Sequence, residues 1–256
     1  MQVKDQLDRT LHFSNPPKRI VSLVPSQTEL LVDLGLREQL VGITKFCVHP
    51  KTLRKEITVV GGTKQVKSEK IRALAPDIII CNKEENTKEM VGELSRVAPI
   101  WVSDISNLEE NFEMIQTLGD LFMVSEKASE IITEIRKEAG EFELTMQKVP
   151  VRKTAYLIWK NPYMAAGRNT FIDHLMRCNR FKNIMEEESR YPEVSMKDLK
   201  EADLVLLSSE PFPFKEKDMV ELSEKTGKEV RLVDGEYFSW YGSRLLQAFQ
   251  YFRTLH

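Results

Sequence analysis

The same strand-and-helix pattern occurs once in each half of the sequence, and this repetition constrains the fold more than any other feature. An apolar stretch at residues 20–24 precedes Ser-Gln-Thr-Glu at residues 26–29, and an apolar stretch at residues 155–159 precedes Thr-Phe-Ile-Asp at residues 170–173. In both tetrads a hydroxyl residue stands three positions before an acid, which is typical of a capping box. We therefore expect a strand followed by a capped helix in each half.

A second shared pattern is a short helix that leads into an apolar strand. It occupies residues 68–80 in the first half and residues 195–207 in the second. Duplicated α/β halves bring two sets of strand ends and helix N-termini together, and open α/β sheets bind ligands outside the carboxyl ends of their strands. The repetition predicts an α/β protein with two lobes and a ligand cleft between them.

A long stretch with helical periodicity separates the two copies. Its apolar residues recur at spacings of three and four, at positions 128, 131, 132, 135, 139, 142 and 146, and its acidic and basic residues fill the other face. A helix from Ser125 to Thr145 would be roughly 30 Å long. Two interpretations are open: a stiff helix bridging the lobes, or an ordinary helix packed on one sheet. The first predicts an N-terminal lobe at 1–121, a bridging helix at 122–147 and a C-terminal lobe at 148–256.

Strands and helices alternate along the rest of the chain, which predicts mainly parallel sheets. In the first half we expect strands near 20–24, 41–44, 57–60, 77–81 and 99–102, and helices near 27–35, 67–74, 86–96 and 108–121. In the second half we expect strands near 153–159, 203–208 and 229–233, and helices near 170–178, 195–200, 216–226 and 241–255.

Composition excludes several other classes of protein. With 37 basic and 39 acidic residues the formal charge is −2, so no global field favours nucleic acid or an anionic membrane. Cys47, Cys81 and Cys178 show no CxxC spacing, which argues against a disulfide framework and a structural zinc site. No run of about 18 apolar residues exists to span a bilayer. A phosphate-binding loop of the GxxxxGK[ST] type is also absent.

Several segments, in order, match a known family. They are Lys-Arg-Ile-Val-Ser-Leu-Val-Pro-Ser-Gln-Thr-Glu at 18–29, Val-Gly-Ile-Thr at 41–44, Gly-Gly-Thr at 61–63, Ile-Arg-Ala-Leu-Ala-Pro-Asp-Ile-Ile-Ile at 71–80 and Ala-Gly-Arg-Asn-Thr-Phe-Ile at 166–172. The chain closely resembles the substrate-binding proteins of ABC importers for vitamin B12 and ferric siderophores. The segment Pro-Ser-Gln-Thr-Glu at 25–29 favours the corrinoid-binding branch of this family. The resemblance implies two α/β lobes joined by one rigid helix, a large ligand held between them, delivery to membrane subunits, and no enzymatic activity.

Aromatic residues in loops expected to face the cleft are candidates for ligand contact. Aromatic rings supply large, stiff contact area, which suits a bulky corrinoid or iron complex. Each of these residues could instead belong to a core. They are Phe46, Trp159, Tyr163, Trp240 and Tyr241.

Small and polar residues complete the expected ligand-binding set. Gly62 and Thr63 lie in a segment that allows close backbone approach, and the helix start at Gln27 offers free N–H groups. The rest of this group is Ser26, Gly167 and Arg244.

Cys47 and His49 form the most chemically suggestive pair. Standing two positions apart, they could reach one side of an extended loop, as axial ligands of cobalt or haem iron or as a reactive thiol and its partner. An ordinary loop is the alternative. With only four histidines in the chain, a zinc or manganese site is disfavoured, and we expect no resident metal or cofactor.

Three functions compete at this point. The first is a monomeric binding protein for a corrinoid, ferric-siderophore or haem-type ligand. The second is an enzyme with Cys47 as nucleophile and His49 as its partner, for which no orienting third residue or GxSxG motif is found. The third is a cytosolic binding or sensing protein on the same scaffold. The resemblance implies a periplasmic or extracytoplasmic location, whereas the first residues read without an export signal, which would mean the cytoplasm if the chain is full length.

The resemblance also implies a partner surface. In the vitamin B12-binding relatives an acidic residue on each lobe pairs with arginines of the membrane subunits. The matching positions are Glu69 and Asp198, each at the start of a short helix before an equivalent strand. An acid there is also explained by the helix dipole alone.

Overall fold

The computed structural model describes residues 1–256, which form two compact units. The first unit consists of Met1–Asp104, Glu109–Ile135 and Tyr241–Arg244. The second consists of Ile105–Leu108, Arg136–Trp240 and Leu245–His256. None of the helices combines the length and the apolar composition that crossing a bilayer requires.

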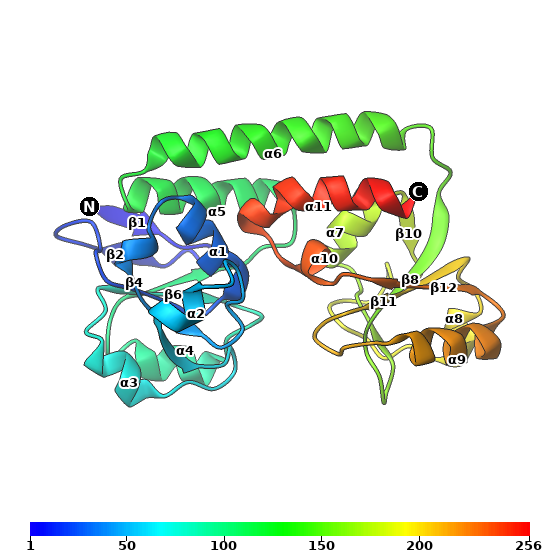
Figure 1. Cartoon of the computed structure of the whole chain (residues 1–256), viewed down its shortest axis with the longest axis horizontal. Helices are drawn as coiled ribbons and strands as arrows, with labels where there is room; N and C mark the ends of the chain where they lie inside the picture. Colours follow the sequence, from blue (N-terminus) through cyan, green and yellow to red (C-terminus); the bar gives the residue numbers. More distant parts are fainter. The chain divides into compact units, whose positions relative to one another are not determined.

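The first unit is built on a five-stranded parallel sheet (Figure 1). In spatial order its strands are β5 (Thr58–Gly61), β4 (Leu40–Thr44), β3 (Ile20–Ser22), β6 (Ile78–Asn82) and β7 (Ile100–Ser103). The central strands β3 and β6 are buried at every position, and both are mainly apolar, although each ends in a buried polar residue, Ser22 or Asn82. The helices are α1 (Pro25–Asp33), η1 (Arg37–Gln39), α2 (Leu53–Glu56), α3 (Ser68–Ala73), α4 (Lys88–Leu94) and α5 (Leu108–Leu121).

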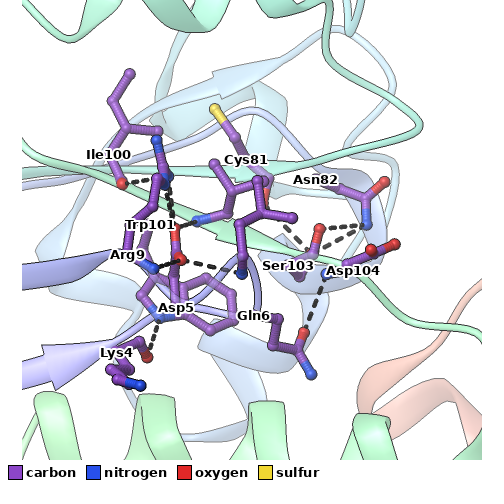
Figure 2. Close-up of polar contacts among 12 residues, drawn as sticks. Lys4, Asp5, Gln6, Arg9, Cys81, Asn82, Ile100, Trp101, Ser103 and Asp104 are labelled. Atoms are coloured by element: carbon purple, nitrogen blue, oxygen red, sulfur yellow. Dashed lines mark hydrogen bonds and ion pairs between the residues drawn. The ribbon is translucent and has the colours of Figure 1, made fainter.

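An N-terminal hairpin covers the exposed edge of β7 (Figure 2). Gln6 N donates to Val102 O at 3.1 Å, and Arg9 Nη2 donates to Ile100 O at 3.0 Å. The Asp5 carboxylate accepts from Val102 N at 3.2 Å and pairs with Arg9 at 2.5 Å. Backbone and side-chain groups of the hairpin thus take the place of a sixth strand at this edge. The hairpin strands are β1 (Gln2–Lys4) and β2 (Thr10–His12).

The second unit also contains a mainly parallel sheet. Its path runs β10 (Phe181–Asn183), β8 (Arg152–Trp159), β11 (Leu204–Ser208) and β12 (Glu229–Val233), and the short β9 (Met164–Ala165) pairs with β8 antiparallel. A core of aliphatic residues from β8, β11 and β12 packs against helices of this unit. The helices are α7 (Phe171–Cys178), α8 (Met196–Leu199), α9 (Glu216–Thr226), α10 (Glu236–Ser239), η2 (Gly242–Arg244, in the first unit), α11 (Leu245–Phe252) and η3 (Arg253–Leu255).

Helix α6 (Ser125–Met146) is continuous, as the periodicity predicted. The division between the units falls inside it, between Ile135 and Arg136. Its predicted apolar face is largely buried. In the second unit, where α6 runs alongside α11 (Figure 1), Phe142 packs against Phe249 and Phe252 of α11, with ring centroids 5.6 and 5.9 Å apart. The finer division into 1–121, 122–147 and 148–256 stays a prediction.

Of the two expected helix caps, the first is wrong, and the second is confirmed for the hydroxyl of Thr170, while Asp173 accepts from Asn183 Nδ2 instead of reaching back to the cap. Helix α1 begins at Pro25, and its N-cap Val24 makes no side-chain bond, because proline is itself well suited to the first helical position. Glu29 bonds to Arg244 instead of reaching back to Ser26. In the second half Thr170 Oγ1 accepts from Asp173 N at 3.1 Å.

The expected helix at 241–255 is also corrected. Residues 242–244 form a 3₁₀ turn, and the α-helix begins only at Leu245. Gly242 has φ +89°, a left-handed conformation that breaks the helix and that glycine adopts at little cost. The hairpin, α2, β9 and β10 are further elements that periodicity did not predict.

Candidate functional site

In each unit the parallel strands end at one edge of the sheet, and the loops that follow them gather there. In the first unit the loops after β4, β5 and β6 are joined by hydrogen bonds. Lys45 N donates to Gly61 O at 2.8 Å, and Asn86 Nδ2 donates to Thr63 O at 2.8 Å. The predicted residues Phe46, Gly62 and Thr63 therefore belong to one cluster of loops.

Phe46 is the most exposed aromatic residue of this edge, with 48% of its surface accessible. Gly62 lies against it, and a Cβ atom added to Gly62 would be 3.3 Å from the Phe46 ring. The Lys45 ammonium lies over the Phe46 ring, 4.9 Å from its centroid. The exposed Phe46 ring is thus in contact with both a glycine and a cation.

A buried polar network lies beneath these loops. Asn82 Nδ2 donates to Ser103 Oγ at 3.0 Å, Gln27 Nε2 also donates to Ser103 Oγ, and Gln27 Nε2 lies 3.2 Å from Tyr241 Oη (Figure 2 shows Asn82 and Ser103). Gln27 and Tyr241 are both buried, and burial raises the pKa of the tyrosine hydroxyl. The two predicted ligand residues are therefore interior groups of the first unit in this structure.

Cys47 is fully buried and packs against two threonine hydroxyls. Its Sγ lies 3.1 Å from Thr28 Oγ1 and 3.3 Å from Thr44 Oγ1. Burial raises the pKa of the thiol, so the nucleophilic thiolate is disfavoured. His49 is half-buried in the same loop, and no group of three or more histidine, cysteine and acidic side chains in the structure is arranged to hold a metal.

Ser26 and Arg244 are also buried in the first unit. Arg244 forms a bidentate ion pair with Glu29, with Nη2–Oε1 and Nε–Oε2 distances of 2.8 and 2.9 Å. The neighbouring Gly242 N donates to Asn111 Oδ1 at 2.6 Å. The segment 241–244 is thus bound into the first unit by side chains of α1 and α5.

The corresponding edge of the second unit carries a ladder of aromatic rings. Trp159, at the end of β8, is 42% exposed. Its ring meets Phe212 edge-on at 5.6 Å, and Phe212 meets the buried Phe214 at 4.8 Å. Sequence reasoning missed Phe212. Its signal was the segment Pro-Phe-Pro-Phe at 211–214, directly after a predicted strand.

The loop after Trp159 is tied to α9 by ion pairs. Lys160 Nζ lies 2.7 Å from Asp218 Oδ1 and 2.7 Å from Glu221 Oε2. Hydrogen bonds from Lys160 lower the pKa of both carboxyls, that of Glu221 to about 2, and they raise the pKa of Lys160. Because Lys160 follows Trp159 directly, this anchor restricts where the indole can lie.

Tyr163 and Gly167 have local structural roles. Tyr163 packs, half-buried, against the core of the second unit, and Tyr163 O accepts from Val194 N at 2.9 Å. Gly167 is buried, and a Cβ atom added to it would be 2.4 Å from Glu188 O. The space beside Gly167, which was expected to contact a ligand, is thus filled by the backbone of the chain itself.

Trp240 is buried and oriented by Glu210. Its Nε1 donates to Glu210 Oε1 at 2.9 Å, and Ser239 Oγ donates to the same oxygen at 2.6 Å. Burial raises the pKa of Glu210 more strongly than these donors lower it. Trp240 belongs to the second unit, whereas the next residue, Tyr241, belongs to the first.

Glu69 and Asp198 lie, as expected, in the first turns of the short helices α3 and α8. The Glu69 side chain is 83% exposed and lies 3.4 Å from Arg72. Asp198 is exposed and closes a capping box with Ser195, whose hydrogen bonds lower its pKa. Both acids thus have local contacts within their own helix, and contact with a transporter stays a prediction.

The structure brings the predicted residues together in two groups, one in each unit. Exposed members are Phe46 and Trp159, and the buried members are Ser26, Gln27, Cys47, Gly167, Trp240, Tyr241 and Arg244. The ligand cleft between the lobes stays a prediction.

A family model described as periplasmic binding protein matches residues 20–228, most of the chain. The chain belongs to the periplasmic binding protein family. This agrees with the resemblance found in the sequence, and the members it matches are named as binding proteins rather than enzymes.

Two curated relatives support the assignment to this family of extracytoplasmic binding proteins. An uncharacterized ABC transporter substrate-binding lipoprotein of Bacillus subtilis, YvrC, is 23% identical over 75% of this chain and 63% of its own length, so more than a third of the lipoprotein lies outside the match. A vitamin B12-binding protein of Pectobacterium atrosepticum is 23% identical over 91% of this chain and 86% of its own length.

Solved structures of similar proteins share the fold. A possible iron-binding periplasmic protein of Staphylococcus epidermidis has a TM-score of 0.80 and 20% identity, over 94% of this chain and 98% of that one. The periplasmic vitamin B12-binding protein of Vibrio cholerae has a TM-score of 0.79 and 21% identity, over 93% and 96%. At this identity the likeness shows the two-lobed α/β fold of periplasmic binding proteins.

Proposed function

We propose that this protein binds a large metal-chelate ligand, either a corrinoid or an iron complex, and delivers it to the membrane subunits of an ABC importer. In this proposal the protein functions outside the cytoplasm as a monomer, and it does not change the ligand chemically. Family membership supports the transport role. The names of the relatives, which include vitamin B12-binding and possible iron-binding proteins, support the class of ligand.

The observation that carries the proposal is an exposed aromatic ring on the carboxyl edge of each sheet. Phe46 and Trp159 keep nearly half of their surface in water, although each ring is held in a fixed position by its neighbours. Fixed, exposed rings at the edge where α/β sheets bind ligands suit contact with a large, flat-faced ligand. The proposal therefore assigns direct ligand contact to Phe46 and Trp159 and a supporting role to the buried Gln27, Tyr241 and Trp240.

No specific observation favours the enzyme. It requires a reactive Cys47, and the thiol is buried against the Thr28 and Thr44 hydroxyls with a raised pKa. A corrinoid or siderophore that brings its own metal ligands fits this environment, because the protein then needs to supply only shape and apolar contact.

The test is a binding titration with cyanocobalamin, haemin and ferrichrome, followed by absorbance and intrinsic fluorescence. For whichever ligand binds, Trp159→Ala and Phe46→Ala are each expected to weaken affinity by roughly thirtyfold, as truncation of an aromatic hot spot does. Leu144→Ala is the control, since Leu144 is an exposed apolar residue on α6 and belongs to neither group of loops at the carboxyl ends of the strands. Unchanged affinity in both aromatic variants would refute the assignment, and binding of none of the three ligands would refute the class of ligand.

A further inference from the structure

A small hollow lies beside the aromatic ladder of the second unit. It has a volume of about 340 Å³ and is lined by residues from the loop after β8, the loop after β11 and the first turn of α9, namely Lys160, Asn161, Phe212, Pro213, Lys215, Lys217 and Asp218. Its volume is at the lower end of the range for small-molecule sites. Phe212 lines the hollow and also contacts the Trp159 ring.

The hollow has more positive than negative charge. Three lysines line it and one carboxylate does, and that carboxylate is already committed, because Asp218 Oδ1 lies 2.7 Å from Lys160 Nζ and Asp218 Oδ2 accepts from Lys215 N at 2.9 Å. Glu221, outside the lining, is shared between Lys160 and Lys225.

Two lysines at the hollow form no ion pair with a carboxylate, although the charge of Lys217 helps to lower the pKa of the neighbouring Asp218. Lys215 and Lys217 are exposed, and neither ammonium forms an ion pair in the structure. The other acid of this turn, Glu216, does not line the hollow. Phe212 and Pro213 supply an apolar wall next to these ammonium groups. Such a surface is complementary to an oxyanion attached to an apolar body.

We propose that this hollow binds a carboxylate or phosphate group on an arm of the transported chelate, with Lys215 and Lys217 as its charged contacts. The inference rests on the proposed function and narrows it: the cargo is a chelate with anionic groups at its periphery. The hollow is a specificity site for that arm, and the metal centre of the cargo lies outside it. A chelate without a negative charge gains nothing from the two lysines.

The first experiment needs no knowledge of the cargo. Phthalate, a small aromatic dicarboxylate, is titrated into the ¹⁵N-labelled protein, and amide shifts are recorded. Saturable shifts are expected at Phe212, Lys215 and Lys217, and they should be lost in Lys215→Gln/Lys217→Gln. The matched control is Lys153→Gln/Lys200→Gln, which removes two exposed lysines of the same unit that do not line the hollow. Shifts that persist in the first double variant, or that never saturate, overturn the proposal.

The second experiment compares haemin, which carries two propionates, with ferrichrome, whose ferric complex has no net charge. Affinity for haemin is expected to fall about tenfold in Lys215→Gln/Lys217→Gln, the effect of losing one charge-assisted hydrogen bond, and to remain unchanged in the control variant. Haemin binding that ignores the two lysines, or tight binding of ferrichrome alone, overturns the inference while the proposed function stands. Failure of both chelates to bind counts against the proposed function, and the phthalate titration then decides on the hollow alone.

Discussion

Arg244 and Glu29 form a bidentate ion pair in the interior of the first unit although 215 positions separate them in the chain. Only 5% of the arginine side chain and 11% of the glutamate side chain are exposed. Burial raises the pKa of Glu29, and the charge of Arg244 opposes that rise. Each charge therefore depends on the other, because a single buried charge without its partner is costly.

Replacing Arg244 by methionine is expected to destabilise the protein by about 3 kcal/mol at pH 7, because it leaves the Glu29 carboxylate buried without a cation. A group whose pKa is raised by folding gives its full stability below its unfolded pKa, about 4.3 for glutamate, and loses it as pH rises through the folded value. The defect should therefore shrink between pH 7 and pH 5, which urea unfolding measures.

The control for this prediction is Arg253→Met. Arg253 pairs with Glu138 at 3.1 Å, but their side chains are 32% and 26% exposed. The expected loss is below about 1 kcal/mol and independent of pH in this range. Equal losses in the two variants would show that the Arg244–Glu29 pair has no special weight.

The hairpin on β7 yields a second prediction. Asp5 accepts hydrogen bonds from Leu7 N, Arg9 N and Val102 N, at 3.0, 2.9 and 3.2 Å. Asp5→Ala removes the acceptor of the buried Val102 N and of the partly buried Leu7 N and Arg9 N, and is expected to cost about 2–4 kcal/mol. Hydrogen exchange at Val102 should accelerate. Asp8→Asn is the control, since Asp8 is almost fully exposed in its pair with Lys4 and asparagine tolerates its left-handed backbone (φ 60°); this change should have no measurable effect.

Glu210 yields a prediction in which a substitution maintains or raises the stability of the protein instead of lowering it. Because burial raises its pKa, the charged carboxylate at pH 7 costs stability that the protonated form does not. Glu210→Gln keeps an oxygen for Trp240 and Ser239 and is expected to match or exceed wild-type stability at pH 7, with no gain near pH 4. Glu210→Ala loses both bonds and should destabilise by about 1–3 kcal/mol. A glutamine variant that is clearly less stable at pH 7 than at pH 4, relative to wild type, would contradict this account.

The partner surface can be tested separately from ligand binding. Glu69→Arg combined with Asp198→Arg is expected to abolish association with the cognate transporter and to leave ligand affinity intact, because surface charges act on encounter with the partner. Pull-down with the transporter in detergent measures association. Since Asp198 also caps α8, Ser195→Ala serves as the control that loses the cap and keeps the charge. Normal association of the double charge variant would exclude this docking mode.

Most of the fold follows from local sequence patterns. The continuous apolar runs at β3, β6, β8 and β11 and the spacing within α6 lie within a few residues of where periodicity placed them. The errors occur where distant residues decide. Glu29 lies three positions after Ser26 in a good capping pattern, yet it bonds to Arg244, and no pattern within α1 contains that information.

The candidate site was predictable in part for the same reason. Loop position identified Phe46 and Trp159, which are exposed. Loop position also identified Trp240 and Tyr241, but Glu210 and Gln27 hold these rings in the interior, and such partners cannot be read from the neighbouring sequence. Phe212 was missed because its role depends on contact with Trp159, far away in the chain.

The insertion of residues 241–244 into the first unit also sets the order in which the protein is completed during synthesis. The rest of that unit is translated by Ile135, and the ribosome, at roughly 5–20 residues per second, then needs on the order of ten seconds to reach Arg244. During that interval the first unit lacks residues 241–244. A nascent chain arrested before Tyr241 therefore carries a first unit in which Glu29 has no guanidinium beside it.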